Sequence, residues 1–273
     1  MSGNLRLIID NLHDAATLTA TSEALPITYT QRSGRAYPWR SVDTSEQVIE
    51  GSFETLTFLD TVVLYRHNLS ASATVRLERL RNTDVVSDTG EVSAAELIAP
   101  PLLRLGVDPW GASYNDKIPV QVKPFWLEPD FATGYRITIK DSANPDGCIQ
   151  IGCIIVGFSF SPTFNASYGV KLTEVEMVEH RRTEGGSLRS VGSDGIYRRL
   201  NIDLKHMDDA DRTTLTTELV KRGRRANIFV SLYPKQGGVK EVEHSFLAKR
   251  EGDYEHIHDF YNNWQTSLSF LEV

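Results

Sequence analysis

Histidines near the C-terminus are the first residues whose spacing could support chemistry. His256 and His258 are two positions apart and precede Asp259. Residues two apart in a β-strand share a face, so these imidazoles could bind one metal ion, with His244 as a third ligand. However, the surrounding segment is rich in Tyr and Asn and offers no thiolate, which is more typical of a solvated or interface loop. We therefore expect no metal site.

Acid–base and nucleophilic sites are also weakly indicated. The pairs Glu179-His180 and Glu243-His244 are adjacent in sequence. Adjacent residues of a strand point to opposite faces, which disfavours an acid–base dyad. The sequence contains no Gly-x-Ser-x-Gly elbow, phosphate-binding glycine loop or His-Glu-x-x-His motif. We expect a protein that is not an enzyme and that needs no cofactor.

A first candidate binding group lies in the N-terminal half. An aromatic face beside guanidinium and amide donors suits a sugar ring, and the chain offers Trp39, Arg40, His67 and Asn68. These four residues are the candidate glycan contacts. The alternative is that Trp39 packs at the end of a β-sandwich, and we favour this interpretation.

A second group consists of five arginines around a Gly- and Ser-rich segment, residues 184–195. They are Arg181, Arg182, Arg189, Arg198 and Arg199. If the flanking runs 170–178 and 197–204 pair as strands, this segment is the flexible tip of a long hairpin with basic shoulders. Arg is enriched at protein interfaces, so the five residues are candidates for a subunit contact. A solvated loop is the open alternative, and nucleic acid is disfavoured.

The elements that must position these residues are mainly strands. Runs such as 200–204, 228–232 and 266–270 alternate apolar and polar residues with a period of two. Gly-, Asn- and Asp-containing turns separate the runs, among them Asn144–Gly147, Gly185-Gly186, Ser193–Gly195 and Gly237-Gly238. This pattern predicts a mainly β protein.

One long helix is predicted, at residues 209–222. Asp208 is a good N-cap, acidic residues fill the first turn, and Lys221 and Arg222 lie in the last turn. Gly223 fits the position after the helix. A shorter helix is expected at residues 93–98, before two prolines.

Length and charge suggest two domains. The Pro-, Asn- and Gly-containing segment 161–169 marks a boundary, which predicts a β-sandwich at residues 1–165 and a second domain at 166–273. Residues 1–165 hold 13 Lys and Arg against 19 Asp and Glu, and residues 166–273 hold 16 against 17. Neither half has the basic excess of a nucleic-acid binder. No run is long enough for a membrane span, no secretory signal is read, and Cys148 and Cys153 are expected to be free thiols.

Short motifs resemble a known fold family. The segments Tyr37–Ser41, Glu46–Phe53 and Thr61–Leu69 follow the order of strands and loops in galactose-binding-like, discoidin-type jelly rolls. The corner His67–Ser70, followed by Ala73–Leu77, resembles accessory structural proteins from the tail-tip gene block of long-tailed bacteriophages.

The second half is similar in outline to the tube-like domains of phage tail and distal-tail proteins. Tyr197–Leu204, the capped helix, and Arg222-Gly223 before Ile228–Tyr233 carry this likeness. It implies an antiparallel β domain with one helix packed on its sheet.

Together, these resemblances imply a virion structural protein of the tail tip or baseplate. Such a protein would assemble as a homo-oligomeric ring through its C-terminal domain and contact the tube, hub and tape-measure proteins. It would reside in the virion tail, and in the host cytoplasm during assembly. The alternative is an adsorption protein that binds host surface glycans.

Overall fold

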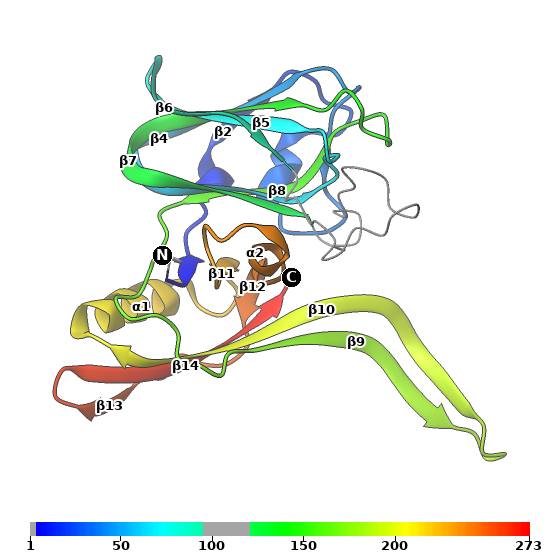
Figure 1. Cartoon of the computed structure of the whole chain (residues 1–273), viewed down its shortest axis with the longest axis vertical. Coiled ribbons are helices and arrows are strands. Elements are labelled where there is room, and N and C mark those ends of the chain that lie inside the picture. The colour runs from blue at the N-terminus through cyan, green and yellow to red at the C-terminus, as the bar shows by residue number, and fades with distance from the viewer. Residues whose placement is uncertain (1–3, 95–120) are drawn as a thin grey trace, which may run out of the picture. The chain divides into compact units, whose positions relative to one another are not determined.

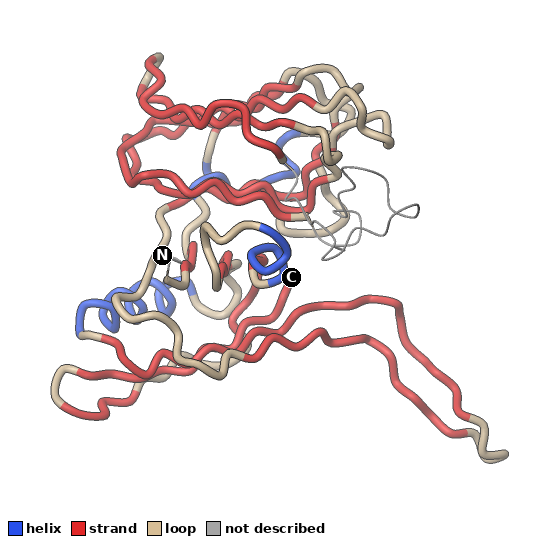
Figure 2. Tube along the Cα trace, viewed as in Figure 1, coloured by secondary structure: helices blue, strands red, loops and turns tan. Residues whose placement is uncertain are grey.

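A computed structural model describes residues 4–94 and 121–273 of the chain. Strands dominate the fold (Figure 2), which confirms the mainly β prediction. The chain forms two compact units. The first contains Met1–Ser161 and Phe229–Phe246, and the second contains Pro162–Ile228 and Leu247–Val273. The sequence suggested one crossing between domains, at 165/166, whereas the chain crosses between these units three times.

The first unit is built on one antiparallel sheet, ordered β3-β8-β4-β7-β5-β6, with β2 also paired to β4. Its strands are β2 (Thr17–Ala20), β3 (Trp39–Arg40), β4 (Gln47–His67), β5 (Thr74–Arg81), β6 (Asp84–Ser93), β7 (Val122–Lys140) and β8 (Gln150–Gly157). Two 3₁₀-helices, η1 (Leu12–Ala15) and η2 (Ile27–Gln31), lie in the N-terminal segment.

Two long strands fold this sheet into a sandwich. β4 pairs with β7 along its whole length, but the register shifts between Ser52 and Thr57 and again between Leu59 and Thr61. Before the shifts β4 also pairs with β2, and after them it pairs with β8. β-bulges bend strands, so β4 and β7 pass from one layer to the other (Figure 1). Apolar side chains such as Ile49 fill the space between the layers.

A buried polar chain fixes the N-terminal segment to this core. Tyr135 lies opposite Gly51 in the β4–β7 register. A Cβ atom on Gly51 would lie 2.4 Å from the Tyr135 ring, so only glycine leaves room for it. The Tyr135 hydroxyl contacts Nδ1 of His13, and Nε2 of His13 lies 2.8 Å from Oγ1 of Thr30.

The segment that returns to the first unit is anchored there by strand pairing and by a buried carboxylate. β1 (Arg6–Ile8) pairs with β11 (Ile228–Ser231). Glu241, in the short helix α2 (Gly238–Glu243), accepts hydrogen bonds from Trp126 Nε1 at 2.7 Å and from two backbone N–H groups at residues 235 and 237. Helix α2 begins at Gly238, where the sequence predicted a Gly237-Gly238 turn.

The second unit is an antiparallel sheet with one longer helix. Its strands are β9 (Lys171–Arg182), β10 (Leu188–Met207), β12 (Ser245–Arg250), β13 (Ile257–Phe260) and β14 (Asn263–Glu272). β14 pairs with β10, β12 and β13, and β10 pairs with β9. The predicted pairing of 170–178 with 197–204 is confirmed, since Val175 lies opposite Tyr197.

Helix α1 (Asp209–Arg222) has the predicted bounds and caps. The Asp208 side chain accepts from the Asp211 N–H at 2.8 Å, and Gly223 has a φ of 71° and donates to Leu219 O. Leu215 and Leu219 are buried. Of the shorter helix expected at 93–98, residues 95–98 lie outside the described part of the chain, and Ser93 ends β6. Among the described residues, no helix is long and apolar enough to cross a membrane.

Candidate functional site

Three of the four candidate glycan contacts, Trp39, His67 and Asn68, form hydrogen bonds within the first unit. The Trp39 ring has no exposed surface, and its Nε1 donates to Ser22 O at 3.2 Å. A ring without an exposed face cannot stack on a sugar, which favours the packing role for Trp39. Arg40 is the exposed member of the four.

His67 and Asn68 belong to a closed polar corner. The His67 ring is buried, and its Nδ1 accepts from Leu69 N–H at 3.3 Å. Burial lowers the pKa of His67 to about 4. The Asn68 amide donates to Asp146 Oδ2 and Cys148 O, at 2.8 and 2.9 Å, and accepts from Gln150 N–H at 2.7 Å. Most of the bonding capacity of this amide is therefore used within the fold.

An exposed aromatic group that the sequence analysis missed lies on the loop before Trp39. Tyr29 and Tyr37 meet edge to face with centroids 5.4 Å apart, and the Arg32 guanidinium lies over both rings, at 5.5 and 5.2 Å. Tyr37 is 42% exposed. Tyr37 lies two residues before Trp39, but the neighbouring sequence does not show which of these two rings faces solvent.

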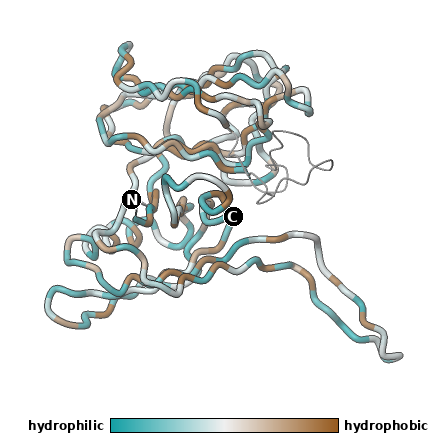
Figure 3. Tube along the Cα trace, in the orientation of Figure 1, coloured by the Kyte–Doolittle hydropathy of each residue, from teal (hydrophilic) through white to brown (hydrophobic). Residues whose placement is uncertain are grey.

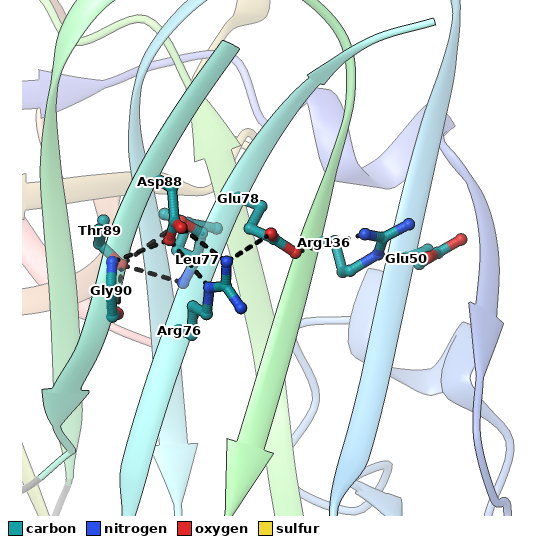
Figure 4. Close-up of polar contacts among 8 residues, drawn as sticks. All are labelled: Glu50, Arg76, Leu77, Glu78, Asp88, Thr89, Gly90 and Arg136. Carbon is teal, nitrogen blue, oxygen red and sulfur yellow. Dashed lines mark hydrogen bonds and ion pairs between the residues drawn. The ribbon is translucent and has the colours of Figure 1, made fainter. Parts of the chain in front are cut away.

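A ladder of charges crosses the outer face of the sandwich. Arg136 pairs with Glu50 and Glu78, and Arg76 pairs with Glu78 and Asp88, at N–O distances of 2.6 to 3.3 Å (Figure 4). The hydrogen bond from Arg76 lowers the pKa of Asp88 to about 2. Every charge here has an opposite partner: the buried Glu78 carboxylate pairs with both arginines, and the other four side chains are partly exposed. Ion pairs between exposed side chains contribute little free energy.

The C-terminal histidines stack on a tryptophan. His258 lies flat on Trp264 with centroids 4.2 Å apart, and His256 meets the same ring edge-on at 5.2 Å. The two imidazoles thus share a face, as strand geometry predicts. His244 instead contacts Tyr233, and its Nδ1 lies 2.9 Å from Lys240 O. Within the described residues, no three His, Cys, Asp or Glu side chains are grouped to hold a metal ion.

The main exposed feature of the second unit is the far end of the β9–β10 hairpin. The hairpin extends away from the other strands of the second unit (Figure 1), and all residues from 179 to 193 are exposed. We call residues 176–196 the arm. Apolar side chains recur along it (Figure 3), and four of them are between 49% and 58% exposed. These are Met177, Leu188, Val191 and Ile196.

A bulge bends the arm where a turn was expected. Met177 alone lies between the paired positions 176 and 178 of β9, whereas three residues, Ser193–Gly195, lie between 192 and 196 of β10. Gly192 has a φ of 152°, and a Cβ there would lie 2.0 Å from Met177 O. The true turn is shorter, at residues 183–187, so most of the predicted flexible tip is strand.

The five predicted interface arginines divide into two sets. Arg181, Arg182 and Arg189 lie exposed on the arm. Arg198 is buried and forms a two-pronged ion pair with Glu272, at 2.8 and 3.0 Å, and Arg199 pairs with Glu251 at 3.0 Å. Arg198 and Arg199 therefore stabilise the base of the hairpin, whereas Arg181, Arg182 and Arg189 lie on its exposed end.

Two hollows on the surface of the described residues are small. One of about 180 Å³ lies in the second unit over β10, β13 and β14, and one of about 110 Å³ lies beside the charge ladder of the first unit. Small-molecule sites usually enclose roughly 300–1,000 Å³. Neither hollow has the size of a substrate pocket.

No protein-family model and no curated protein matches the chain. Solved structures similar to it include a family 32 carbohydrate-binding module of C. perfringens NanJ in complex with galactose (15% identity, 56% of this chain, 98% of that chain, TM-score 0.39). Another is the lectin domain of lectinolysin complexed with Lewis B antigen (11%, 55%, 98%, TM-score 0.39). A putative alpha-L-fucosidase from Bacteroides thetaiotaomicron matches over 30% of its own length and 57% of this chain (13%, TM-score 0.41). At such low identities and TM-scores, these likenesses assign neither a ligand nor a family to this chain.

Proposed function

We propose that this chain is a structural protein that assembles with further copies of itself through the arm, as part of the tail tip or baseplate of a long-tailed bacteriophage. The observation that carries the proposal is the arm itself, a two-stranded ribbon with exposed apolar side chains. Its function is assembly, without chemistry.

An isolated two-stranded ribbon is unfavourable in free energy. A two-stranded hairpin is marginally stable in water, because it buries little apolar surface. Ordering each backbone residue costs roughly 1–2 kcal/mol at room temperature. The arm nevertheless exposes Met177, Leu188, Val191 and Ile196 to solvent. A protein partner that covers these side chains would offset the ordering cost, and subunit contacts are the usual cover for exposed strands.

The tail-tip setting rests on the sequence resemblance of residues 166–273 to tube-like domains. In that setting, the copies form a ring, and tube, hub and tape-measure proteins are its neighbours. The second unit supplies the ring contacts in this proposal.

The test is the mass of the full-length protein in solution. Size-exclusion chromatography with light scattering, over a hundredfold range of concentration, should show a defined oligomer. Replacing Met177 and Val191 together with Ser should shift the equilibrium to monomer. The matched control replaces two half-exposed valines outside the arm, Val85 and Val220, with Ser, and should leave the oligomer intact. A wild-type protein that stays monomeric throughout contradicts the proposal.

A second candidate function is glycan binding by the first unit. The observation that favours it is the exposed Tyr29–Arg32–Tyr37 group, which offers an aromatic face beside a guanidinium. Binding to a glycan array should then be lost in Tyr37→Ala and weakened in Arg40→Ala. Tyr168→Ala, in the second unit, is the control with a fully exposed ring. An array without signal rejects this candidate.

A further inference from the structure

We infer that the arm of one copy docks on the opposite end of the second-unit sheet in another copy, at an acidic surface around β13. This inference rests on the proposed assembly function and names the contact that would build it. It follows from the charges at the two ends of the sheet and from the distance between them.

One face of the arm is basic. Arg181 and Arg189 lie directly opposite each other in the β9–β10 register, so their side chains share a face. Like charges at opposed positions destabilise a strand pair. Arg181 has an ion pair with Glu179 at 2.8 Å, between two side chains that are largely exposed. Within the described part of the chain, Arg189 has no ion-pair partner. Negative charge from another molecule would stabilise these two opposed arginines.

Apolar side chains accompany these arginines. Val191 lies opposite Glu179, which places it on the face of Arg181 and Arg189, and Met177 follows at the next position of the same face. Glu179 lies on the same face, so the charged groups there are two arginines and one carboxylate. We call Arg181, Arg189, Val191 and Met177, together with Glu179, the basic face of the arm. Arg182 is directed to the other face, where its guanidinium donates to Gly186 O at 3.1 Å.

The surface around β13 has the complementary chemistry. The 180 Å³ hollow is lined by residues of β10, β13 and β14 and by Glu255, two residues before β13. Its acidic and apolar members include Asp203, Glu255 and Ile257, with Lys205 as its one cation among the lining residues. Ile257 is 56% exposed, and Asp259 follows two residues later on β13. We call Asp203, Glu255, Ile257 and Asp259 the acceptor surface.

One copy cannot make this contact with itself. The acceptor surface and the arm lie at opposite ends of the second unit (Figure 1). Strand β10 connects them, with Arg189 near one end and Asp203 near the other. At about 3.3 Å per strand residue, these positions are separated by roughly 45 Å along the strand. The basic, partly apolar face of the arm and the acidic, partly apolar acceptor surface within one chain are therefore complementary only between copies.

Charge reversal and mixing test this contact in the full-length protein. The arm variant carries Arg181→Glu and Arg189→Glu, and the acceptor variant carries Glu255→Lys and Asp259→Lys. Each alone should weaken self-association at least about tenfold, because like charges then meet at the contact. An equimolar mixture of the two variants should associate again, since each arm then finds an oppositely charged acceptor surface.

Two further variants make the result decisive. A chain with all four reversals should associate with itself and should not mix with wild type. Lys221→Glu with Arg225→Glu reverses two exposed charges away from both surfaces, and should associate like wild type. All variants should keep the wild-type circular dichroism, since the changed side chains are exposed.

The outcomes separate this inference from the proposed function. If wild type associates and the arm and acceptor variants behave like the control, the arm docks elsewhere and the inference is wrong while assembly stands. If the arm variant does not self-associate and the equimolar mixture with the acceptor variant does not associate either, the arm docks on a surface other than the acceptor surface. If wild type is monomeric at every concentration, the assembly function itself fails.

Discussion

Two buried histidines link the stability of the first unit to pH. Burial lowers the pKa of His13 to about 3, and burial, followed by the nearby Lys123, lowers that of His67 to about 4, against an ordinary value of 6.5. From pH 6.5 down to about 4, the unfolded chain therefore binds protons that the folded chain does not. The free energy of unfolding is highest above pH 6.5 and falls as the pH falls through this window.

We expect the free energy of unfolding to drop by about 1–3 kcal/mol between pH 7.5 and pH 5.5, given ~1.4 kcal/mol per pH unit for each histidine. Urea denaturation at the two pH values measures this. His67→Gln should remove about half of the drop. His180→Gln, at an exposed position of the arm, should leave it unchanged. A stability that is equal at both pH values contradicts the buried neutral imidazoles.

A second prediction at the scale of single residues separates packing from binding. Trp39→Ala should lower the free energy of unfolding by about 3–5 kcal/mol, because it leaves a cavity in the core. Tyr37→Ala, two residues earlier and half-exposed, should lower it by only about 1 kcal/mol, because it removes the contact with Tyr29 but leaves no cavity in the core. Denaturant titration of both variants measures the difference. Equal effects would mean that the Trp39 ring does not fill the core.

Single residues also show where sequence reasoning stops. The sequence identified His67 and Asn68 as polar groups at a corner, but the partners of Asn68 lie far along the chain. Asn68 is satisfied by Asp146, Cys148 and Gln150, 78 to 82 residues away. Whether a polar side chain is free to bind depends on such partners, and local spacing carries no information about them.

At the scale of elements, local signals were the most informative. Helix α1 was predicted with its bounds because its N-cap, its end charges and Gly223 all act within one turn of the helix. Helix α2 was missed because it has six residues and begins at a glycine. Ser193–Gly195 was interpreted as a turn, since turns and bulges favour the same small polar residues. Only the pairing of β9 with β10 distinguishes the two.

The bulge gives a prediction about the arm as an element. Gly192→Ala would place a methyl group against Met177 O and force an L-residue to a φ near 152°. We expect faster hydrogen–deuterium exchange in the arm and weaker self-association, with the core strands of the second unit unaffected. Gly185→Ala is the matched control, because nothing lies within 4 Å of a Cβ there. Exchange that is alike in both variants would show that the arm tolerates side chains at its bulge.

At the scale of the whole molecule, local sequence patterns could not predict that residues 229–246 return to the first unit. β11 supplies the strand partner of β1, and Glu241 accepts from Trp126. Both contacts join residues more than a hundred positions apart. A fragment of residues 1–165 should therefore show faster amide exchange at Arg6–Ile8 than the full chain, and rejoining residues 229–246 through a short linker should restore protection. Equal protection in the fragment would mean that β1 needs no β11.

Assembly of the whole molecule should also be visible to a protease. Arg182 and Arg189 flank the exposed turn at 183–187, so trypsin should cleave there quickly in a dilute sample. If the arm is covered by another copy, this cleavage should slow as the protein concentration rises above that at which the oligomer forms. Cleavage at Arg35, in an exposed loop of the first unit, serves as the internal control and should keep its rate. Peptide mass spectrometry of timed digests measures both sites in one sample. Arm cleavage that stays as fast as Arg35 cleavage in the oligomer would mean that the subunits associate without covering the arm.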